Sequence, residues 1–386
     1  MEYFISTTEI GIFMKLIIDN SNLFDGGGLQ VAMSFVNDLR ELGLEHSYYI
    51  VNSPNAAKIF EKEKYPENFY FTTLPEAGHG NIFKRGRRLR NIEKKLKPDV
   101  IFTVFGPSYH KSRQVKVVGF AIPYIVYPDS PFLSLISIKE KIRYKLLSLL
   151  KSYCFKSFSD ALIFETEDAK QIFVSNHQYK KQTFTVGNTL NEIFFKPLKW
   201  KELEINTNSS LKILFLTANY PHKNMKILPE VIQILIDKYK IKDFCFLITL
   251  DKNDLNFSEQ TNKYITYLGK IELEKIPSLY KKSNIVFIPT LLEVFSATYL
   301  EAMFMKKPII ASDMGFSRDI CRESAYFCNP IDPEEYAKAI YELASNESLR
   351  NKLVNNGTEN LKRFGRSLDR TKKYLNILQQ TINNKK

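Results

Sequence analysis

The sequence predicts an α/β protein built from two Rossmann-like domains, each with a parallel sheet. Strand-like and helix-like segments alternate along the whole chain, as is typical of parallel strands joined by crossover helices. One polar stretch, 196–210, interrupts the alternation; it contains Pro197 and has no clear apolar period. With 386 residues, the chain is long enough for two domains with full cores. We therefore expect a first domain at 1–195, a linker at 196–210, a second domain at 211–366 and a final helix at 367–386.

The first series of elements follows directly from the apolar pattern. The expected segments are a strand at 15–19, a loop at 20–28, a helix at 29–42, strands at 47–52, 99–105 and 115–121, a helical region at 132–158, and strands at 160–165 and 183–187. The first helix is indicated by Val31, Phe35 and Leu39, which recur at intervals of four residues. The helical region at 132–158 fits either one continuous helix or two helices with an interruption.

The second series follows the polar stretch and continues to the end of the chain. The expected segments are strands at 211–218, 244–250, 265–268, 285–290 and 308–313, and helices at 225–239, 273–282, 297–307, 333–344, 347–355 and 367–381. The strand at 285–290 is short and apolar, as expected of a strand that is covered on both faces.

The composition is that of a globular protein with a strong basic excess. Apolar residues make up 44% of the chain and charged residues 25%, and the net charge is +13. Basic residues cluster at 84–97 and again at 139–156, where they alternate with apolar side chains. Three interpretations are open: a solvated helix face, an anionic membrane surface or acceptor, and nucleic acid. No nucleic-acid-binding motif accompanies the charge, so we expect no nucleic-acid partner.

Cysteine spacing and hydropathy point to a protein of the cytoplasm. The four cysteines have no C-x-x-C spacing, which favours reduced structural cysteines. No apolar run approaches the roughly 18 residues needed to span a bilayer, and no secretory leader is recognisable. Met14 begins a strand-like run and resembles a natural start, so we interpret residues 1–13 as a dispensable extension.

Two glutamates at a strand-to-helix turn are the most informative feature. Glu293 follows the strand at 285–290, and Glu301 lies just over one turn into the next helix, whose start Ser296 is placed to cap. Ligands of an open parallel sheet bind at the carboxyl ends of its strands. A helix N-terminus at that edge offers free N–H groups and a positive dipole end to an anion. The arrangement suits a ligand with hydroxyl groups on both sides of a phosphate.

This segment resembles the E-x7-E motif of GT-B glycosyltransferases, in particular glycosyltransferase family 4. The resemblance rests on Glu293, Phe295, Leu300, Glu301 and Ala302, followed by Lys307-Pro-Ile-Ile-Ala311. Two positions depart from the family pattern, because Ser296 and Lys307 stand where the family usually has glycine. The resemblance implies a GT-B fold, with two Rossmann-like domains facing across a cleft and a C-terminal helix returning to the first domain.

Two further turns match the family in part. Asn219-Tyr-Pro-His-Lys223-Asn224 resembles the turn whose lysine holds the donor diphosphate, although the usual arginine before that lysine is absent. Gly26 to Gly28 resemble the glycine-rich loop near the donor phosphates; Gly27 and Gly28 are therefore predicted donor-binding residues. A simple flexible turn is the alternative for the glycines, and an exposed turn lysine is the alternative for Lys223.

The resemblance also assigns roles to the residues of the motif. It implies that Glu301 binds the ribose hydroxyls, that Glu293 contacts the donor sugar, and that backbone N–H groups of Ser296, Ala297 and Thr298 bind the distal phosphate. Glu293 and Lys223 are the predicted catalytic residues. The full predicted donor set is Gly27, Gly28, Asn219, Lys223, Asn224, Glu293, Phe295, Ser296, Ala297, Thr298 and Glu301. No Asp-x-Asp sequence occurs, so we expect no metal and no other cofactor. The histidine that many members carry after a first-domain strand is replaced around Ala121, and His110 is a candidate substitute.

The function implied by the resemblance is retaining transfer of a sugar from a UDP- or GDP-sugar to a glycan or polyprenyl-linked glycan. Members of this kind commonly extend bacterial surface polysaccharides (O-antigen, capsule or lipopolysaccharide) at the cytoplasmic membrane, and the basic clusters are compatible with peripheral location on its inner face. A non-catalytic sugar-nucleotide-binding subunit and a GT-B sugar-nucleotide epimerase are the alternatives. Turnover of a donor by the purified protein separates an enzyme from a binding subunit.

Overall fold

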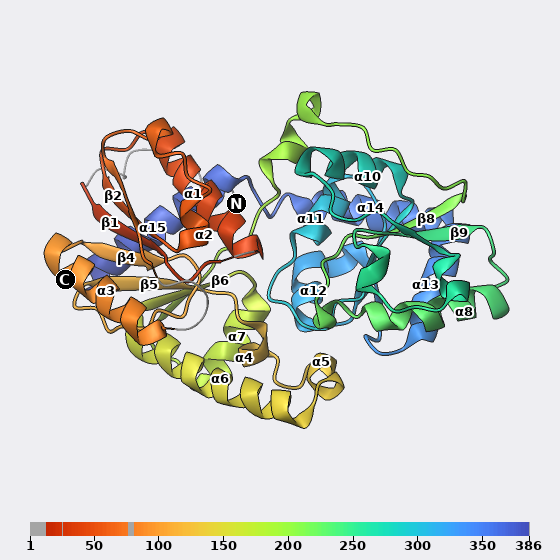
Figure 1. The fold of residues 1–386 in the computed structure, drawn as a ribbon, viewed down its shortest axis with the longest axis horizontal. Helices are drawn as coiled ribbons and strands as arrows, with labels where there is room; N and C mark the ends of the chain where they lie inside the picture. Colours follow the sequence, from red (N-terminus) through yellow and green to blue (C-terminus); the bar gives the residue numbers. More distant parts are fainter. Residues whose placement is uncertain (1–12, 25, 76–80, 386) are drawn as a thin grey trace. The chain divides into compact units, whose positions relative to one another are not determined.

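The computed structural model describes residues 13–24, 26–75 and 81–385, which form two compact units (Figure 1). Unit 1 comprises the described residues up to Ala121, together with Arg143–Asn188 and the described residues from Ser367 onward. Unit 2 comprises Ile122–Ile142 and Thr189–Arg366. The polar stretch 196–210 is counted with unit 2, and its role as a linker stays a prediction. Residues 1–12 of the predicted extension lie outside the described residues.

Unit 1 is built on a seven-stranded sheet. Its elements are β1 (Lys15–Asn20), α1 (Gly26–Leu42), β2 (Ser47–Asn52), α2 (Pro54–Ala57), β3 (Phe69–Thr73), α3 (Ile82–Leu96), β4 (Val100–Thr103), β5 (Val115–Phe120), most of α6 (Ile138–Phe158), β6 (Ala161–Phe164), α7 (Glu167–His177), β7 (Gln182–Thr185) and α15 (Ser367–Lys385). The strand order is β3-β2-β1-β4-β5-β6-β7, and every neighbouring pair is parallel.

Helices cover both faces of this sheet, which explains why its strands are apolar without alternation. On one face Leu16 and Ile18 of β1 pack in a core that includes α1 and α15. On the other face Ile17 packs with Leu89 of α3. Successive residues of one strand therefore serve two separate cores.

The final helix, α15, packs on unit 1. Asp38 of α1 is buried and accepts hydrogen bonds from Ser367 Oγ at 3.1 Å and Thr371 Oγ1 at 2.7 Å. The rings of Phe35 and Tyr374 meet edge to face with centroids 5.6 Å apart. These contacts confirm the predicted return of the C-terminal helix to the first sheet.

Unit 2 is built on a six-stranded sheet. Its elements are α4 (Pro123–Val126), α5 (Pro131–Leu135), the first residues of α6, β8 (Leu211–Phe215), α8 (Leu228–Asp237), β9 (Phe244–Ile248), α9 (Glu259–Asn262), β10 (Ile265–Tyr267), α10 (Ile276–Lys282), β11 (Ile285–Ile288), α11 (Ala297–Phe304), β12 (Ile309–Ser312), α12 (Gly315–Cys321), β13 (Ala325–Cys328), α13 (Pro333–Ser345) and α14 (Glu347–Leu361). The strand order is β10-β9-β8-β11-β12-β13, again with parallel neighbours.

Two opposite cores stabilise this second sheet. One includes Phe246 and Phe287 with helices α8 and α13, and the other includes Val286 with α10 and α11. Both sheets have the doubly wound parallel architecture that the alternation predicts, and the α/β fold class is confirmed.

Of the two alternatives for the helical region at 132–158, the structure shows the interrupted one, with α5 and α6 separated at residues 136–137. Other predicted elements differ from the structure. The predicted loop at 20–28 is too long, because α1 already begins at Gly26. The elements that were not predicted are β3, α2, α3, α4, α7, α9, α12 and β13.

Candidate functional site

The strand order of unit 2 defines where a ligand would bind. After β8 the chain adds β9 and β10 on one side, then returns to add β11, β12 and β13 on the other side. The carboxyl ends of β8 and β11 therefore flank a topological switch point, the usual ligand position in such sheets. The turn with Lys223 follows β8, and the turn with Glu293 follows β11. The fold thus brings together two motifs that lie 70 residues apart in the sequence.

Lys223 and Glu293 form an ion pair at this point. Lys223 Nζ lies 2.7 Å from Glu293 Oε1, and the side chains are only 16% and 18% exposed. The two turns are also joined through the backbone, because Leu291 N donates to His222 O at 2.8 Å. The pair places a cation and a carboxylate at the edge of the sheet, and both are partly shielded from water.

Three buried polar atoms of the segment 290–299, one of them in the pair itself, have no hydrogen-bond partner within the described part of the chain. They are Glu293 Oε2, Thr290 Oγ1 and the Tyr299 hydroxyl. Burial raises the pKa of Tyr299 well above its ordinary value, and the charge of Glu293 adds to the effect. Buried polar groups normally find partners, so this grouping favours a ligand that carries hydroxyl groups.

The N-terminus of α11 lies in the same turn. Ser296 occupies the N-cap position with extended backbone, but its side chain makes no capping hydrogen bond. The prediction that Ser296 occupies the N-cap position is confirmed, but the predicted hydrogen bond from its side chain to the helix is wrong. Ala297 and Thr298 of the first turn are partly exposed. A helix start without a side-chain cap keeps its N–H groups for another acceptor, such as a phosphate oxygen.

Glu301 lies one turn further along α11. Its carboxylate is partly buried and accepts a hydrogen bond from the Tyr280 hydroxyl at 2.8 Å. Burial raises the pKa of Glu301 to about 7, and the bond from Tyr280 offsets only part of this rise. Near neutral pH the carboxyl therefore holds a proton part of the time, and a ligand hydroxyl that donates to it would favour the charged form.

Replacement of this buried carboxyl should have a pH-dependent effect on stability. The folded-state pKa of about 7 lies above the ordinary 4.5, so the stabilisation is present below about pH 4.5 and is lost as the pH rises through 7. Glu301→Gln is expected to raise the free energy of unfolding at pH 8 by about 2–3 kcal/mol relative to wild type, and by little at pH 4. Denaturant unfolding at the two pH values checks this, with the exposed Glu259→Gln as control. Equal stability of Glu301→Gln and wild type at pH 8 would contradict the burial argument.

His222 precedes Lys223 and lies among aromatic rings. It stacks on Tyr220 with ring centroids 5.5 Å apart, and Phe132 meets it edge-on at 6.0 Å. Burial, followed by the charge of Lys223, lowers the pKa of His222 to about 4. The imidazole is therefore neutral at pH 7, and the cationic charge of this turn comes from Lys223.

The other predicted residues of unit 2 have structural partners of their own. Asn224 is buried in the left-handed conformation with φ 60°, and its Nδ2 donates to Pro330 O at 3.0 Å. Asn219 is exposed, and its Nδ2 lies 3.4 Å from Asp254 O. Phe295 is half-buried and meets the ring of Phe364 at 5.9 Å. Asn224 thus fixes the turn that presents Lys223.

Gly27 and Gly28 belong to unit 1, at the corresponding switch point between β1 and β4. Gly26 has φ +69° and opens α1, so the glycines form the first turn of this helix and not a loop. The prediction of a glycine-rich loop is corrected here. The loop between β1 and α1 is attached to the segment that follows β4, because Asn22 Nδ2 donates a hydrogen bond to Phe105 O at 2.5 Å.

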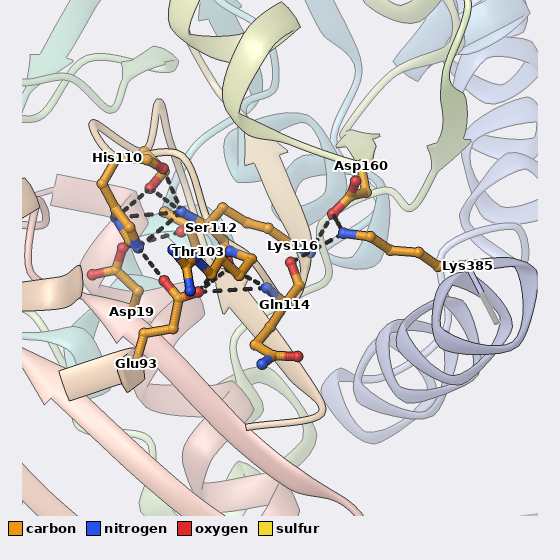
Figure 2. Close-up of polar contacts among 11 residues, drawn as sticks. Asp19, Glu93, Thr103, His110, Ser112, Gln114, Lys116, Asp160 and Lys385 are labelled. Atoms are coloured by element: carbon orange, nitrogen blue, oxygen red, sulfur yellow. Dashed lines mark hydrogen bonds and ion pairs between the residues drawn. The ribbon is translucent and has the colours of Figure 1, made fainter. Parts of the chain in front are cut away.

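His110 lies in a buried polar cluster of unit 1 (Figure 2). Its Nε2 is 3.1 Å from Glu93 Oε2, and Lys116 Nζ donates to His110 O at 2.7 Å. Burial, the largest influence, lowers the pKa of His110. Since its side chain is enclosed, His110 is a structural residue of this cluster, and the role of accessory histidine does not suit it.

One contribution to the site was missed at the level of sequence. The segment Ile122–Ile142 lies in unit 2, although strands β6 and β7 of unit 1 come after it in the chain. Ser130 Oγ donates to Leu291 O at 2.6 Å, two residues before Glu293, and also accepts from Phe132 N at the start of α5. The Ser-Pro pair at 130–131 is a helix-start signal that could have located α5. The contact of Ser130 with the turn after β11 depends on the fold, and no short sequence motif predicts it.

The described residues include neither a cluster of metal ligands nor a helix that could span a bilayer. Among residues 13–24, 26–75 and 81–385, no group of three His, Cys, Asp or Glu side chains is placed to hold a metal ion. The helices in these ranges include none that is both long and apolar enough to cross a bilayer. The four cysteines are free and buried.

One family model and several curated proteins match part of the chain. Residues 199–360 match the family of glycosyl transferases group 1. An uncharacterized glycosyltransferase of Methanocaldococcus jannaschii is 30% identical over 171 residues, 42% of this chain and 47% of that protein. The O-antigen chain mannosyltransferase RfbU of Salmonella typhimurium is 25% identical over 165 residues, 41% of this chain and 46% of its own length. The chain thus spans about half the length of these curated relatives.

Solved structures resemble the whole chain. A glycosyltransferase of Rickettsia africae has a TM-score of 0.69 at 18% identity, covering 97% of this chain and 100% of that one. Sucrose-phosphate synthase of Thermosynechococcus elongatus has a TM-score of 0.72 at 13% identity, with coverage of 97% and 100%. Anabaena HepE, solved with UDP and glucose, has a TM-score of 0.66 at 14% identity, with coverage of 95% and 100%. The chain therefore has the GT-B fold, and its residues 199–360 match the model of the glycosyl transferases group 1 family.

Proposed function

We propose that this protein is a retaining glycosyltransferase that uses a nucleotide-sugar donor and no metal. The observation that supports it most is the Lys223–Glu293 ion pair at the switch point of unit 2, together with the three unpaired buried polar atoms of 290–299 and the start of α11. The match of residues 199–360 to group 1 glycosyl transferases and the likeness to HepE, solved with UDP and glucose, support a nucleotide-sugar as donor.

The proposed donor contacts follow from the charges of the site. The diphosphate binds Lys223 and the N–H groups of the first turn of α11, both of which favour an anion. As the diphosphate takes over Lys223, Glu293 is released to accept hydrogen bonds from the sugar hydroxyls. Glu301 accepts from the ribose hydroxyls on the other side.

Transfer breaks the bond between the sugar's anomeric carbon and the distal phosphate oxygen. Lys223 and the α11 N-terminus stabilise the negative charge that develops on this oxygen. The acceptor hydroxyl attacks from the same face and gives its proton to the departing phosphate oxygen, so the anomeric configuration is kept. The products are the glycosylated acceptor and a nucleoside diphosphate.

We place the reaction on a glycan or polyprenyl-linked glycan of a surface polysaccharide, with the protein peripheral on the inner face of the cytoplasmic membrane. RfbU, which is 25% identical over 165 residues, is an O-antigen chain mannosyltransferase. The net charge of +13 favours an anionic surface or acceptor.

The test is donor turnover by the purified protein in excess EDTA. A thermal-shift screen of UDP-, GDP- and ADP-sugars first selects the donor, because a ligand that binds only the folded state raises its stability. Release of nucleoside diphosphate is then measured with and without EDTA, and the configuration of the released or transferred sugar is determined by proton NMR. We expect equal rates with and without EDTA, and retention of configuration.

Other outcomes would remove parts of the proposal. Activity that disappears in EDTA and returns only with Mg²⁺ or Mn²⁺ contradicts the role given to Lys223 and α11 in leaving-group stabilisation. Donor binding without any turnover points to a non-catalytic binding subunit. Absence of binding to all the sugar nucleotides would overturn the donor site itself.

A further inference from the structure

Helix α6 presents an unusual outer face. Six large apolar side chains on it are between 44% and 76% exposed: Ile138, Ile142, Leu146, Leu149, Leu150 and Tyr153. An α-helix has 3.6 residues per turn, so positions 138, 142, 146, 149 and 153 follow one stripe along its length. A surface helix normally shows polar residues there, and contiguous exposed apolar side chains usually mark an interaction site. We call these six residues the α6 apolar face.

The opposite face of α6 explains how the helix is held. Phe155 is buried against Phe120 of β5, with ring centroids 4.9 Å apart, and meets Phe173 of α7 at 6.1 Å. Ser152 and Cys154 are buried beside it. Helix α6 is therefore packed against the sheet through one set of side chains. The α6 apolar face is a second set, which points toward solvent.

Cations border the α6 apolar face on both sides. Five basic residues of the helix are exposed: Lys139, Lys141, Arg143, Lys145 and Lys156. At about 100° per residue, Arg143 lies beyond one edge of the apolar face, and Lys141 and Lys145 lie beyond the other. Lys156 is in line with Ile138 at that second edge, and Lys139 projects between Leu146 and Leu150. The only acidic residue of α6 is Glu140, which binds Ser137 at the helix start. Within the described part of the chain, no carboxylate pairs with any of the five cations.

We propose that α6 docks the protein on an anionic lipid bilayer, lying in the plane of the surface with its apolar face inserted. An outward apolar stripe edged by lysine and arginine is the pattern of a helix that lies at the bilayer interface, where long basic side chains reach the head groups. A spanning orientation does not fit a helix with five exposed cations. The inference refines the membrane location proposed above and is measured without any donor.

Charge complementarity selects this occupant over a second copy of the chain. In a two-fold pairing through α6, the same basic edges would approach one another and repel. An anionic bilayer offers both an apolar layer for the six side chains and negative head groups for the five cations. The other basic cluster of the sequence, at 84–97, is a poorer candidate, because Phe83 is the only exposed large apolar side chain among the described residues of α3 and no apolar stripe runs along that helix. From the sequence alone, Arg85 counts as one of the surface charges of that cluster. In the structure it is buried, with its guanidinium 5.3 Å from the Phe24 ring centroid.

The test is co-sedimentation with vesicles in about 50 mM salt. The vesicles contain phosphatidylcholine alone or with about 30% phosphatidylglycerol. Leu146→Asp with Leu149→Asp removes the centre of the apolar face, and Leu198→Asp with Leu273→Asp is the matched control on other exposed leucines. Wild type and the control pair should bind the anionic vesicles, and the α6 pair should bind at least about tenfold more weakly. Replacing Lys139, Lys141, Arg143 and Lys145 by Gln should weaken binding by about fivefold per residue.

A measurement of donor binding distinguishes failure of the membrane proposal from failure of the proposed function. Calorimetry with the selected nucleotide should give the same affinity for wild type and the α6 pair, which also shows that the variant is folded. If wild type does not bind anionic vesicles, or if the α6 pair binds as well as wild type, the proposal is overturned while the donor site stands. If wild type is a dimer that the α6 pair converts to monomers, the face belongs to a second copy, and the bilayer proposal is also overturned.

Discussion

Glu93→Gln is expected to lower the free energy of unfolding of unit 1 by about 3–5 kcal/mol, the cost typical of removing one partner from a buried ionic network. Glu93 is 5% exposed, and its Oε1 accepts from Arg113 N at 2.7 Å and Ser112 Oγ at 2.8 Å. Its other oxygen meets His110, which lies against the buried Lys116 (Figure 2). A glutamine places an NH₂ group where an acceptor is needed and removes one of the three carboxylates, Asp19, Glu93 and Asp160, whose charges compensate the buried Lys116 cation.

Denaturant unfolding followed by circular dichroism measures this change. Glu61→Gln is the matched control, because that side chain is 69% exposed in its pair with Lys64 and should change stability by no more than about 0.5 kcal/mol. The chain's one tryptophan, Trp200, lies in unit 2, so its fluorescence midpoint should move less than the dichroism midpoint. A Glu93→Gln variant as stable as the control would contradict the network's role.

The effect should also depend on pH. Burial alone would raise the pKa of Glu93, but the hydrogen bonds from His110, Arg113 and Ser112 outweigh it and lower the pKa to about 2. Because the folded-state pKa lies below the ordinary 4.5, the stabilisation is present above about pH 4.5 and is lost as the pH falls toward 2. The difference between wild type and Glu93→Gln should therefore shrink in this range. A difference that stays constant down to pH 3 would show that it does not arise from the ionised carboxylate.

Lys223→Ala is expected to lower donor turnover by about 10²–10³-fold, the cost typical of losing one group that stabilises charge in a transition state. The variant removes the cation proposed to hold the diphosphate and leaves Glu293, which is 18% exposed, without its ion-pair partner. Steady-state release of nucleoside diphosphate gives kcat and KM for the donor. Lys226→Ala is the matched control, since this lysine is exposed and three residues away.

Lys223→Arg tests whether charge alone is sufficient. Arginine keeps the cation but changes its shape, so partial recovery of turnover is expected relative to Lys223→Ala. If Lys223→Ala keeps the wild-type kcat and KM, the assignment of Lys223 to the leaving group is wrong.

The sequence predicted the strands of unit 2 other than β13, because buried strands appear as short apolar runs. Helix α3 was missed for the opposite reason. Its buried positions are Arg85, Gly86, Leu89 and Glu93, so only one large apolar residue marks the face that packs on the sheet. Arg85 packs on Phe24, and Glu93 belongs to the polar cluster. A helical period counted in apolar residues cannot detect such a face.

The sequence names candidate site residues, and these stay a prediction, but it does not show which of them are in contact. Lys223 and Glu293 are singled out by local motifs, but their ion pair depends on the adjacency of β8 and β11, which only the folded sheet establishes. The buried partner of Glu301, Tyr280, belongs to another helix and has no motif of its own. The bond from Ser130 to the β11 turn spans 161 residues. Local sequence patterns specify the turns, and the strand order specifies which turns meet.

The most direct test of the donor site in unit 2 is calorimetric titration of wild type, Lys223→Ala and Glu301→Gln with two ligands. One ligand is the nucleoside diphosphate selected by thermal shift, and the other is the same nucleoside without phosphates. Glu301→Gln should weaken the binding of both ligands, because the ribose is common to them. Lys223→Ala should weaken only the diphosphate, by at least about tenfold. Unchanged affinity of both variants for the nucleoside diphosphate would contradict the assignment of these two residues to the donor.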